Sequence, residues 1–298
     1  MRLHDDEVPI DLELVRRLLR GQAPDLAGRD LRPAPAQGTD NLMFILGGDL
    51  VVRLPRKAAA VDGLLVERRW LATLAPRLPL GVPLPVVDGE PTSDYPFPWA
   101  VCRWLPGAPV APGGLRTEDV PRLAEFVRAL RAADPTGGPP VPPGRRAGPL
   151  SAYDAVFERA LGPAARVDPG LVDQRRARAV WHAARDAPAW SAPGVWVHRD
   201  LYGGNLLTAG GRLSGVIDFG GLAVGDPAGD VMAAFHVVTS EDRGAFRALL
   251  AVDDDTWARG RAWALAQGLE ALPYYLDTHP GMVAMARQAV AATLADQG

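Results

Sequence analysis

With 298 residues, of which 48% are apolar, the chain is long enough to form one large domain or two lobes with a sizeable buried core. Its net charge of −3 gives no electrostatic support for bulk binding to nucleic acid or to a membrane surface. The sequence contains no apolar run of about 18 residues that would span a bilayer. The single cysteine, Cys102, excludes an intrachain disulfide, and the N-terminus lacks an apolar signal core. We therefore expect a soluble cytoplasmic protein.

The first hundred residues begin with one short helix and then change to a pattern of strands. Residues 11–20 carry leucines and a valine on one face, with Asp11 as a capping residue and Gly21 as a stop. Residues 42–46 and 50–54 flank a Gly-Gly-Asp turn, which predicts a β-hairpin. Further elements are expected at residues 58–74 (helix), 83–87 and 99–105 (strands). Residues 1–105 thus predict a small antiparallel sheet with one prominent helix.

Prolines and glycines at residues 106–114 interrupt this pattern and place the expected lobe boundary after residue 105. The remainder, 106–298, is predicted to be mainly helical. Helices are expected at residues 123–130, from a capping-box-like Ser151, at 171–187, and from about 226, 242, 255 and 282. The Pro/Gly-rich stretch 134–149 is predicted to be a loop or a mobile excursion. Together the two halves predict an α+β fold.

The most informative stretch is 197–220. An apolar strand, 195–197, ends at a polar loop, and strands at 205–208 and 213–217 surround a Gly-Gly turn. A hairpin of that length brings Asn205 and Asp218 close together at one end. Two such oxygen donors suit Mg²⁺, which usually takes one or two carboxylates together with substrate phosphates. Asp200 would lie a few ångströms away, where it could accept a proton from an attacking hydroxyl.

These residues also have simpler interpretations. A single aspartate such as Asp200 or Asp218 often only caps a loop or a turn, but the whole set in this order argues against that interpretation. His198 is better explained as a core histidine that shapes the loop than as a metal ligand. A metallohydrolase based on His198 and Asp200 lacks further histidines at ligand spacing.

The same stretch carries a family resemblance. His198-Arg199-Asp200-Leu201, then Asn205, then Asp218-Phe219-Gly220 fill every lettered position of the kinase catalytic loop and of the metal-binding triplet that follows it. Weaker matches occur in the same order at residues 38–41, 51–56, 67, 104–107, 225–227, 230 and 267–275. The chain thereby resembles the aminoglycoside phosphotransferase family, which comprises small-molecule kinases related to protein kinases.

The resemblance implies a bilobal protein-kinase-like fold, with a small antiparallel-sheet N-lobe, a mainly helical C-lobe, and ATP or GTP bound between them. Asp200 would be the catalytic base, and Asn205 and Asp218 would bind Mg²⁺. Asp226 and Asp230 would be structural turn and cap residues. The chain has no glycine-rich G-x-G-x-x-G loop and no A-P-E motif, which argues against a protein kinase.

The nucleotide-binding residues are expected in the first hundred or so residues. Arg53 occupies the position of the kinase strand lysine, with Glu67 as its expected helix partner, although either could instead be an exposed surface charge. A small polar turn at 38–41 offers backbone N–H groups to phosphate, and the linker around 103–105 would meet adenine. The expected nucleotide-binding residues are Arg53, Glu67, Thr39, Asn41, Arg103 and Leu105. Arg199 receives no role.

The C-terminal section suggests the kind of acceptor. Residues 226–298 contain ten acidic and five basic residues, which suits a small cationic acceptor with a hydroxyl group, such as an aminoglycoside antibiotic. Asp253-Asp254-Asp255 could bind such an acceptor, but these residues are at least as well explained as the solvated start of a helix. The expected substrate-binding residues are Glu270, Tyr274, Tyr275 and Asp277. The alternatives are a same-fold kinase of another small alcohol (a macrolide, a peptide antibiotic or a metabolite) and a catalytically silent nucleotide-binding module.

Overall fold

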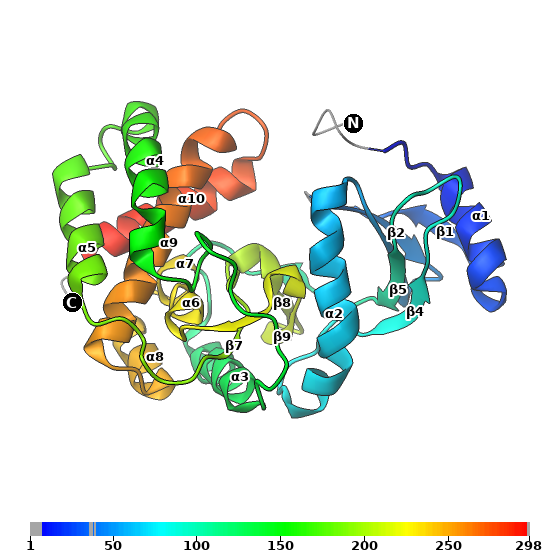
Figure 1. Cartoon of the computed structure of the whole chain (residues 1–298), viewed down its shortest axis with the longest axis horizontal. Coiled ribbons are helices and arrows are strands. Elements are labelled where there is room, and N and C mark those ends of the chain that lie inside the picture. The colour runs from blue at the N-terminus through cyan, green and yellow to red at the C-terminus, as the bar shows by residue number, and fades with distance from the viewer. Residues whose placement is uncertain (1–7, 36–37, 39, 297–298) are drawn as a thin grey trace. The chain divides into compact units, whose positions relative to one another are not determined.

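The computed structural model describes residues 8–35, 38 and 40–296. The chain divides into two compact units, Met1–Pro76 with Gly81–Pro106 and Arg77–Leu80 with Gly107–Gly298 (Figure 1). The first unit is built on an antiparallel sheet and the second is mainly helical, so the expected α+β composition is confirmed.

The sheet of the first unit has the strand order β1-β2-β3-β5-β4, and every neighbouring pair is antiparallel. Its strands are β1 (Leu31–Pro33), β2 (Asn41–Leu46), β3 (Leu50–Pro55), β4 (Pro85–Gly89) and β5 (Trp99–Arg103). The predicted hairpin is β2 and β3, in which Phe44 lies opposite Val52. β1 was not predicted because only three of its residues pair with β2.

Alternating side chains on these strands separate two small cores. Leu50, Val52 and Leu54 of β3 pack in the core that contains the apolar face of α1 (Leu12–Gln22), whose first turn is capped by Asp11 as predicted. Val51 of β3 belongs to the other cluster, which contains a leucine of α2 (Val61–Leu74). Because side chains alternate, Arg53 shares the α2 face with Val51.

The second unit is organised around the long helix α9 (Asp254–Tyr274), which packs against α10, α4, α5 and α6. Its other helices are α3 (Val120–Ala132), α4 (Asp154–Val167), α5 (Gln174–Asp186), α6 (Ala228–Val231), α7 (Ala233–His236), α8 (Arg243–Leu250) and α10 (Pro280–Ala295). Trp181 and Trp263 meet edge to face in the core between α5 and α9. The predicted capping box is wrong, because Ser151 lies in a 3-10 turn and α4 begins at Asp154 with no side-chain cap.

Short strands in this unit position the catalytic stretch. β8 (Leu206–Ala209) and β9 (Arg212–Val216) form the expected hairpin, and β6 (Ala108–Pro109) pairs with β8. β7 (Val195–Val197) pairs with β10 (Ala223–Gly225). The loop 134–149 is not a free excursion, because Val224 of β10 donates to the Pro139 carbonyl (2.7 Å) and accepts from Val141 N–H (3.2 Å). It therefore lies along β10 as an extension of that small sheet.

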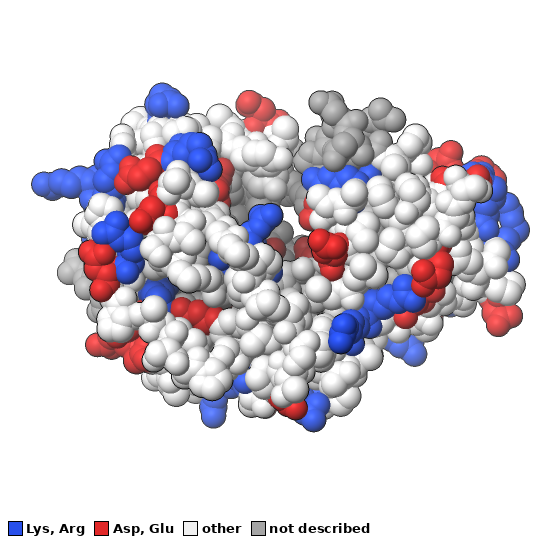
Figure 2. All heavy atoms as spheres, in the orientation of Figure 1, with Lys and Arg blue, Asp and Glu red and all other residues white. Residues whose placement is uncertain are grey.

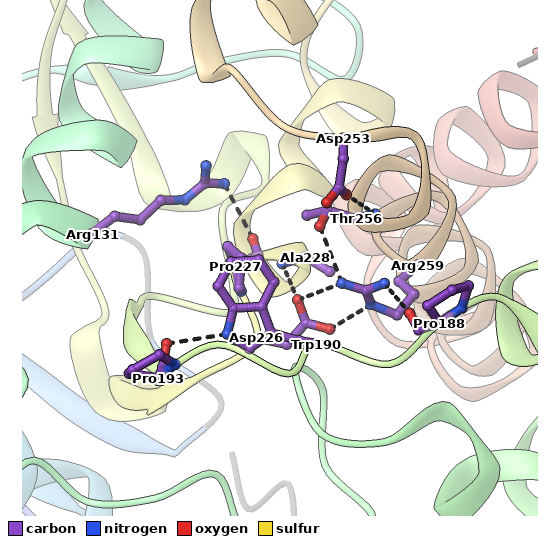
Figure 3. Close-up of polar contacts among 10 residues, drawn as sticks. All are labelled: Arg131, Pro188, Trp190, Pro193, Asp226, Pro227, Ala228, Asp253, Thr256 and Arg259. Atoms are coloured by element: carbon purple, nitrogen blue, oxygen red, sulfur yellow. Dashed lines mark hydrogen bonds and ion pairs between the residues drawn. The ribbon is translucent and has the colours of Figure 1, made fainter.

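A buried ion pair braces the turn that follows β10 (Figure 3). Arg259 of α9 donates to both carboxylate oxygens of Asp226, from Nε at 2.6 Å and from Nη2 at 3.3 Å. Asp226 also accepts from Ala228 N–H (2.9 Å), and Arg131 of α3 donates to the Pro227 carbonyl (3.2 Å). Asp226 therefore has a structural role, in line with the expectation from sequence.

None of the helices in the described part of the chain combines the length and the apolar character needed to cross a membrane. On the face drawn in Figure 2, basic and acidic side chains are interspersed.

Candidate active site

A buried carboxylate binds the backbone of the loop between β7 and β8. Asp230 of α6 accepts the backbone N–H groups of His198 (3.0 Å) and Arg199 (2.8 Å). The His198 ring is fully buried, contacts Phe219 edge to face, and has its Nε2 atom 3.1 Å from the Ile217 carbonyl. His198 is thus a loop-shaping residue, and its contacts with Ile217 and Phe219 join the loop after β7 to the segment after β9.

Arg199, which received no role from sequence, joins three segments of the second unit. Its backbone is left-handed (φ 67°), its Nε donates to the Gly221 carbonyl, and its Nη1 donates to the Arg146 carbonyl at 3.3 Å. Burial lowers the pKa of its guanidinium to about 10, and the nearby Arg146 adds to that shift. Its partners are backbone carbonyls, which no sequence pattern identifies.

The Asp200 carboxylate is fixed by donors from three parts of the second unit. Its Oδ1 accepts from Arg146 Nη1 (2.9 Å) and from Gln267 Nε2 of α9 (3.1 Å). Its Oδ2 accepts from Asn205 Nδ2 (3.1 Å). An ionised carboxylate has about four lone-pair sites, so among the described residues Oδ2 keeps the larger capacity to accept a further hydrogen bond. The roles of Arg146 and Gln267 were not predicted.

Asn205 and Asp218 are brought together by the β8–β9 hairpin. The Asn205 carbonyl accepts from Ile217 N–H (2.9 Å), which extends the ladder one step beyond the Leu206–Val216 pair. Asp218 follows in the left-handed conformation (φ 64°, ψ 64°), which aspartate tolerates better than most residues. Burial raises the pKa of Tyr202, and the charges of both Asp200 and Asp218 add to that shift. Both carboxylates therefore lie within electrostatic reach of one hydroxyl.

The donor set fits a magnesium ion. Asn205 Nδ2 donates to the Asp200 carbonyl (2.9 Å) as well as to its carboxylate, so the amide oxygen is the atom left for a ligand. Asp218 adds an exposed carboxylate. Within residues 8–35, 38 and 40–296, no group of three or more His, Cys, Asp or Glu side chains could hold a metal on its own. An amide oxygen and one carboxylate suit Mg²⁺, which keeps positions for waters and substrate phosphates.

In the first unit, Arg53 and Glu67 form the predicted strand-to-helix pair. The contact is bidentate, with Arg53 Nη1 bonded to Glu67 Oε2 and Nη2 bonded to Oε1 at 3.3 Å. The two residues are only 8% and 3% exposed. Neither is therefore a surface charge. Burial also raises the pKa of the neighbouring Cys102 thiol to about 11.

The remaining expected nucleotide residues are dispersed over the first unit. Thr39 lies outside the described residues. Asn41 begins β2, and its buried Oδ1 has no hydrogen-bond partner among the described residues. The exposed Arg103 and its neighbour Trp104 both use their N–H groups in backbone hydrogen bonds of 2.9 Å. Of the 103–105 segment, only the half-buried Leu105 has an N–H with no such bond within the described chain.

The residues expected to bind the acceptor have different surroundings and do not all contact one another. Glu270 of α9 accepts from the Tyr153 hydroxyl at 2.5 Å. Tyr275 is half-buried and packs edge to face on Tyr274, which is 64% exposed, while Asp277 is exposed beyond the end of α9.

Several acidic residues of the C-terminal section already have hydrogen-bond or ion-pair partners. Asp253 caps α9, as the simpler interpretation predicted, and Asp254 pairs with Arg247. Arg259 donates to Asp226, and the His198 N–H donates to Asp230. Arg243 forms an ion pair with Asp296. Part of the acidic excess therefore has partners within the fold, so the composition of this section alone does not indicate a cationic ligand.

A family model described as the phosphotransferase enzyme family matches residues 31–263. The chain belongs to this family. It is 31% identical over 196 residues to viomycin phosphotransferase of Streptomyces vinaceus, an alignment that covers 63% of this chain and 68% of the relative. The predicted family is thereby confirmed, and the chain is a phosphotransferase enzyme.

Solved structures of phosphotransferases share the fold. Macrolide 2'-phosphotransferase MphH from Brachybacterium faecium is 26% identical with a TM-score of 0.60, and the match covers 96% of this chain and 98% of that one. The GDP complex of aminoglycoside 2'-phosphotransferase-IIIa is 19% identical with a TM-score of 0.70, covering 96% and 99%. The expected kinase-like fold is confirmed.

A buried histidine, His236, predicts that the stability of this phosphotransferase depends on pH. His236 of α7 is fully buried, and burial lowers its pKa to about 4; the charge of Asp200 opposes this shift and that of Arg146 adds to it. The unfolded chain would protonate near pH 6.5, so stability is complete above that pH and falls as pH drops toward 4. Between pH 7 and 5 we expect His236 to account for a loss of about 2 kcal/mol in the free energy of unfolding.

Urea unfolding at both pH values tests this prediction. His236→Gln should lose less stability than the wild type over that interval, whereas His182→Gln, at an exposed position of α5, should follow the wild type. Equal losses in all three proteins would show that His236 does not titrate on unfolding.

Proposed function

We propose that this enzyme transfers the γ-phosphoryl group of ATP or GTP to a hydroxyl of a small-molecule antibiotic, with an aminoglycoside as the first acceptor to test. The observation that carries the proposal is the Asp200 carboxylate, held by Arg146, Gln267 and Asn205 with capacity left on Oδ2. A general base needs such a fixed orientation and a free acceptor position. We place the reaction in the cytoplasm, where the nucleotide donor is available.

Phosphoryl transfer depends mainly on positioning and on neutralising charge. Asp200 Oδ2 would accept the hydrogen bond of the attacking hydroxyl and then its proton. The new bond joins the acceptor oxygen to the γ-phosphorus, and the bond from that phosphorus to the nucleoside diphosphate breaks. Correct positioning alone can supply about 7–11 kcal/mol in favourable systems.

Other residues are assigned to the nucleotide and its metal. The Asn205 amide oxygen and the Asp218 carboxylate would hold Mg²⁺, which when bound neutralises charge on the β- and γ-phosphates. In the first unit, we assign Arg53, oriented by Glu67, to the phosphates. The backbone of Leu105 is assigned to adenine, because the N–H groups of Arg103 and Trp104 are already bonded within the unit.

Asp218→Asn should lower kcat about 100-fold at saturating nucleotide, because a charged ligand is replaced by a neutral one. It should also raise the Mg²⁺ concentration for half-maximal rate by about tenfold or more. Initial rates over a Mg²⁺ titration measure both effects. Asp25→Asn, at an exposed position, is the matched control and should titrate like the wild type. An unchanged Mg²⁺ requirement in Asp218→Asn would remove Asp218 from the metal site.

Nucleotide consumption, measured with a panel of aminoglycosides, macrolides, peptide antibiotics and simple metabolite alcohols, tests the proposed activity. ATP and GTP are compared as donors, because the 19% identical structure was determined with GDP. Peptide antibiotics are the second acceptor class, since the 31% identical relative is a viomycin phosphotransferase. A product heavier by one phosphoryl group supports the proposal. Nucleotide binding without transfer to any compound would instead support a silent nucleotide-binding module.

A further inference from the structure

Arg146 places a positive charge directly on the proposed base. Its Nη1 lies 2.9 Å from Asp200 Oδ1, and the two side chains are 30% and 22% exposed. Arg146 belongs to the loop 134–149, which lies outside the segments that suggested the site from sequence. A cation at this position is unexpected for an enzyme whose acceptor was predicted to be cationic.

The backbone that carries Arg146 is firmly supported. Its carbonyl accepts from Arg199 Nη1 (3.3 Å), and the Ala147 carbonyl accepts from Asp226 N–H (3.3 Å). Ala147 is buried and left-handed (φ 69°), a conformation that alanine keeps only where its surroundings impose it. A Cβ added at Gly229 of α6 would come within 2.6 Å of the Ala147 side chain, so the loop packs tightly on α6. The backbone that carries the Arg146 guanidinium is therefore held in one position.

This arrangement decides which oxygen of the base the acceptor meets. Arg146 and Gln267 both donate to Oδ1, so the reacting hydroxyl approaches Oδ2 of the same carboxylate. The guanidinium then stands beside the atoms around that hydroxyl. An ammonium group on a neighbouring carbon of the acceptor would meet this like charge, and the Asp200 carboxylate that would attract the ammonium is already paired with Arg146. The pair therefore disfavours an ammonium group relative to a neutral one.

The acidic residue expected to bind the acceptor already has a hydrogen-bond partner within the unit. Glu270, the acidic residue expected to bind the acceptor, is engaged by the Tyr153 hydroxyl at 2.5 Å. Arg145 and Arg146 are both near enough to act on the pKa of Tyr153, which burial raises. Arg146 therefore lies within electrostatic reach of Tyr153 as well as being paired with Asp200.

We propose that Arg146 is a specificity-determining residue, which makes the enzyme prefer acceptor hydroxyls with neutral or anionic neighbours over hydroxyls flanked by ammonium groups. The inference rests on the proposed function and narrows its acceptor class. The preference set by Arg146 would apply among the hydroxyls of one antibiotic as well as among different antibiotics.

A matched pair of probes tests the inference: kanamycin, and kanamycin with its amines acetylated. We expect the wild type to have the higher kcat/KM for the acetylated probe. Arg146→Gln should raise the ratio of kcat/KM for kanamycin over the acetylated probe by about tenfold or more. Arg146→Lys, which keeps the charge, should stay within about threefold of the wild-type ratio. Arg145→Gln makes the same charge change at an exposed position with no ion pair to Asp200 in the described structure, and should behave like Arg146→Lys.

The possible outcomes separate this inference from the proposed function. If the wild type is active and Arg146→Gln leaves the ratio unchanged, or lowers kcat equally for both probes, the selectivity role is wrong while the phosphotransfer proposal stands. A tenfold change in Arg145→Gln would also overturn it, because net charge alone would then explain the effect. If the wild type phosphorylates neither probe, the aminoglycoside acceptor is wrong and the inference falls with it.

Discussion

Asp200→Ala should lower kcat by about three orders of magnitude, within the range expected for loss of a general base. The Kd for ATP should change by no more than about threefold, because Asp200 is assigned to the acceptor hydroxyl and Asn205 and Asp218 to the metal and phosphates. Steady-state phosphate transfer gives kcat, and equilibrium nucleotide titration gives Kd.

Two further variants sharpen this test. Asp200→Asn keeps the size of the side chain, so it separates loss of the proton acceptor from the gap that alanine leaves among Arg146, Gln267 and Asn205. Asp25→Ala removes an exposed aspartate and should have wild-type kinetics. A fall in kcat of less than tenfold for Asp200→Ala would show that Asp200 is not the base.

Glu67→Ala should lower the free energy of unfolding by about 3–5 kcal/mol, because it removes the buried carboxylate that pairs with the buried Arg53 guanidinium. The matched control is Glu90→Ala. Glu90 also pairs with an arginine, Arg68 at 2.7 Å, but its side chain is 64% exposed, so its loss should cost about 1 kcal/mol or less. Urea unfolding of the intact chain measures both values.

A double variant tests the physical reason for this difference. Removing both charges, in Arg53→Met with Glu67→Leu, should cost less than Glu67→Ala, because both members of the buried ion pair are then replaced by apolar side chains. If Glu67→Ala and Glu90→Ala are equally destabilising, the Arg53–Glu67 pair is not desolvated in the folded protein.

Local patterns were sufficient to predict the elements that position the motif. The Asp11 cap, the β2–β3 hairpin and the β8–β9 hairpin each follow from a few neighbouring residues, and the structure contains all of them. The alternation of side chains along β3 also explains why Arg53 reaches Glu67 rather than the core under α1.

The contacts that sequence could not predict are long-range. Gln267 and Arg146 reach Asp200 from 67 and 54 positions away along the chain, and neither forms a motif with it. Loop 134–149 has the composition of a mobile segment, yet hydrogen bonds to Val224 fix it. The acidic C-terminal section suggested a cationic ligand because its internal partners, such as Arg259, are visible only in the fold.

The most direct test of the account follows labelled phosphate from γ-labelled ATP in the presence of Mg²⁺ and the antibiotic panel. With the wild type, we expect the label to appear on a hydroxyl of at least one antibiotic. With Asp200→Ala, the rate of this transfer should be about a thousandfold lower. Label that never leaves the nucleotide for any acceptor, or that is transferred equally well by both proteins, would contradict a phosphotransfer site built on Asp200, Asn205 and Asp218.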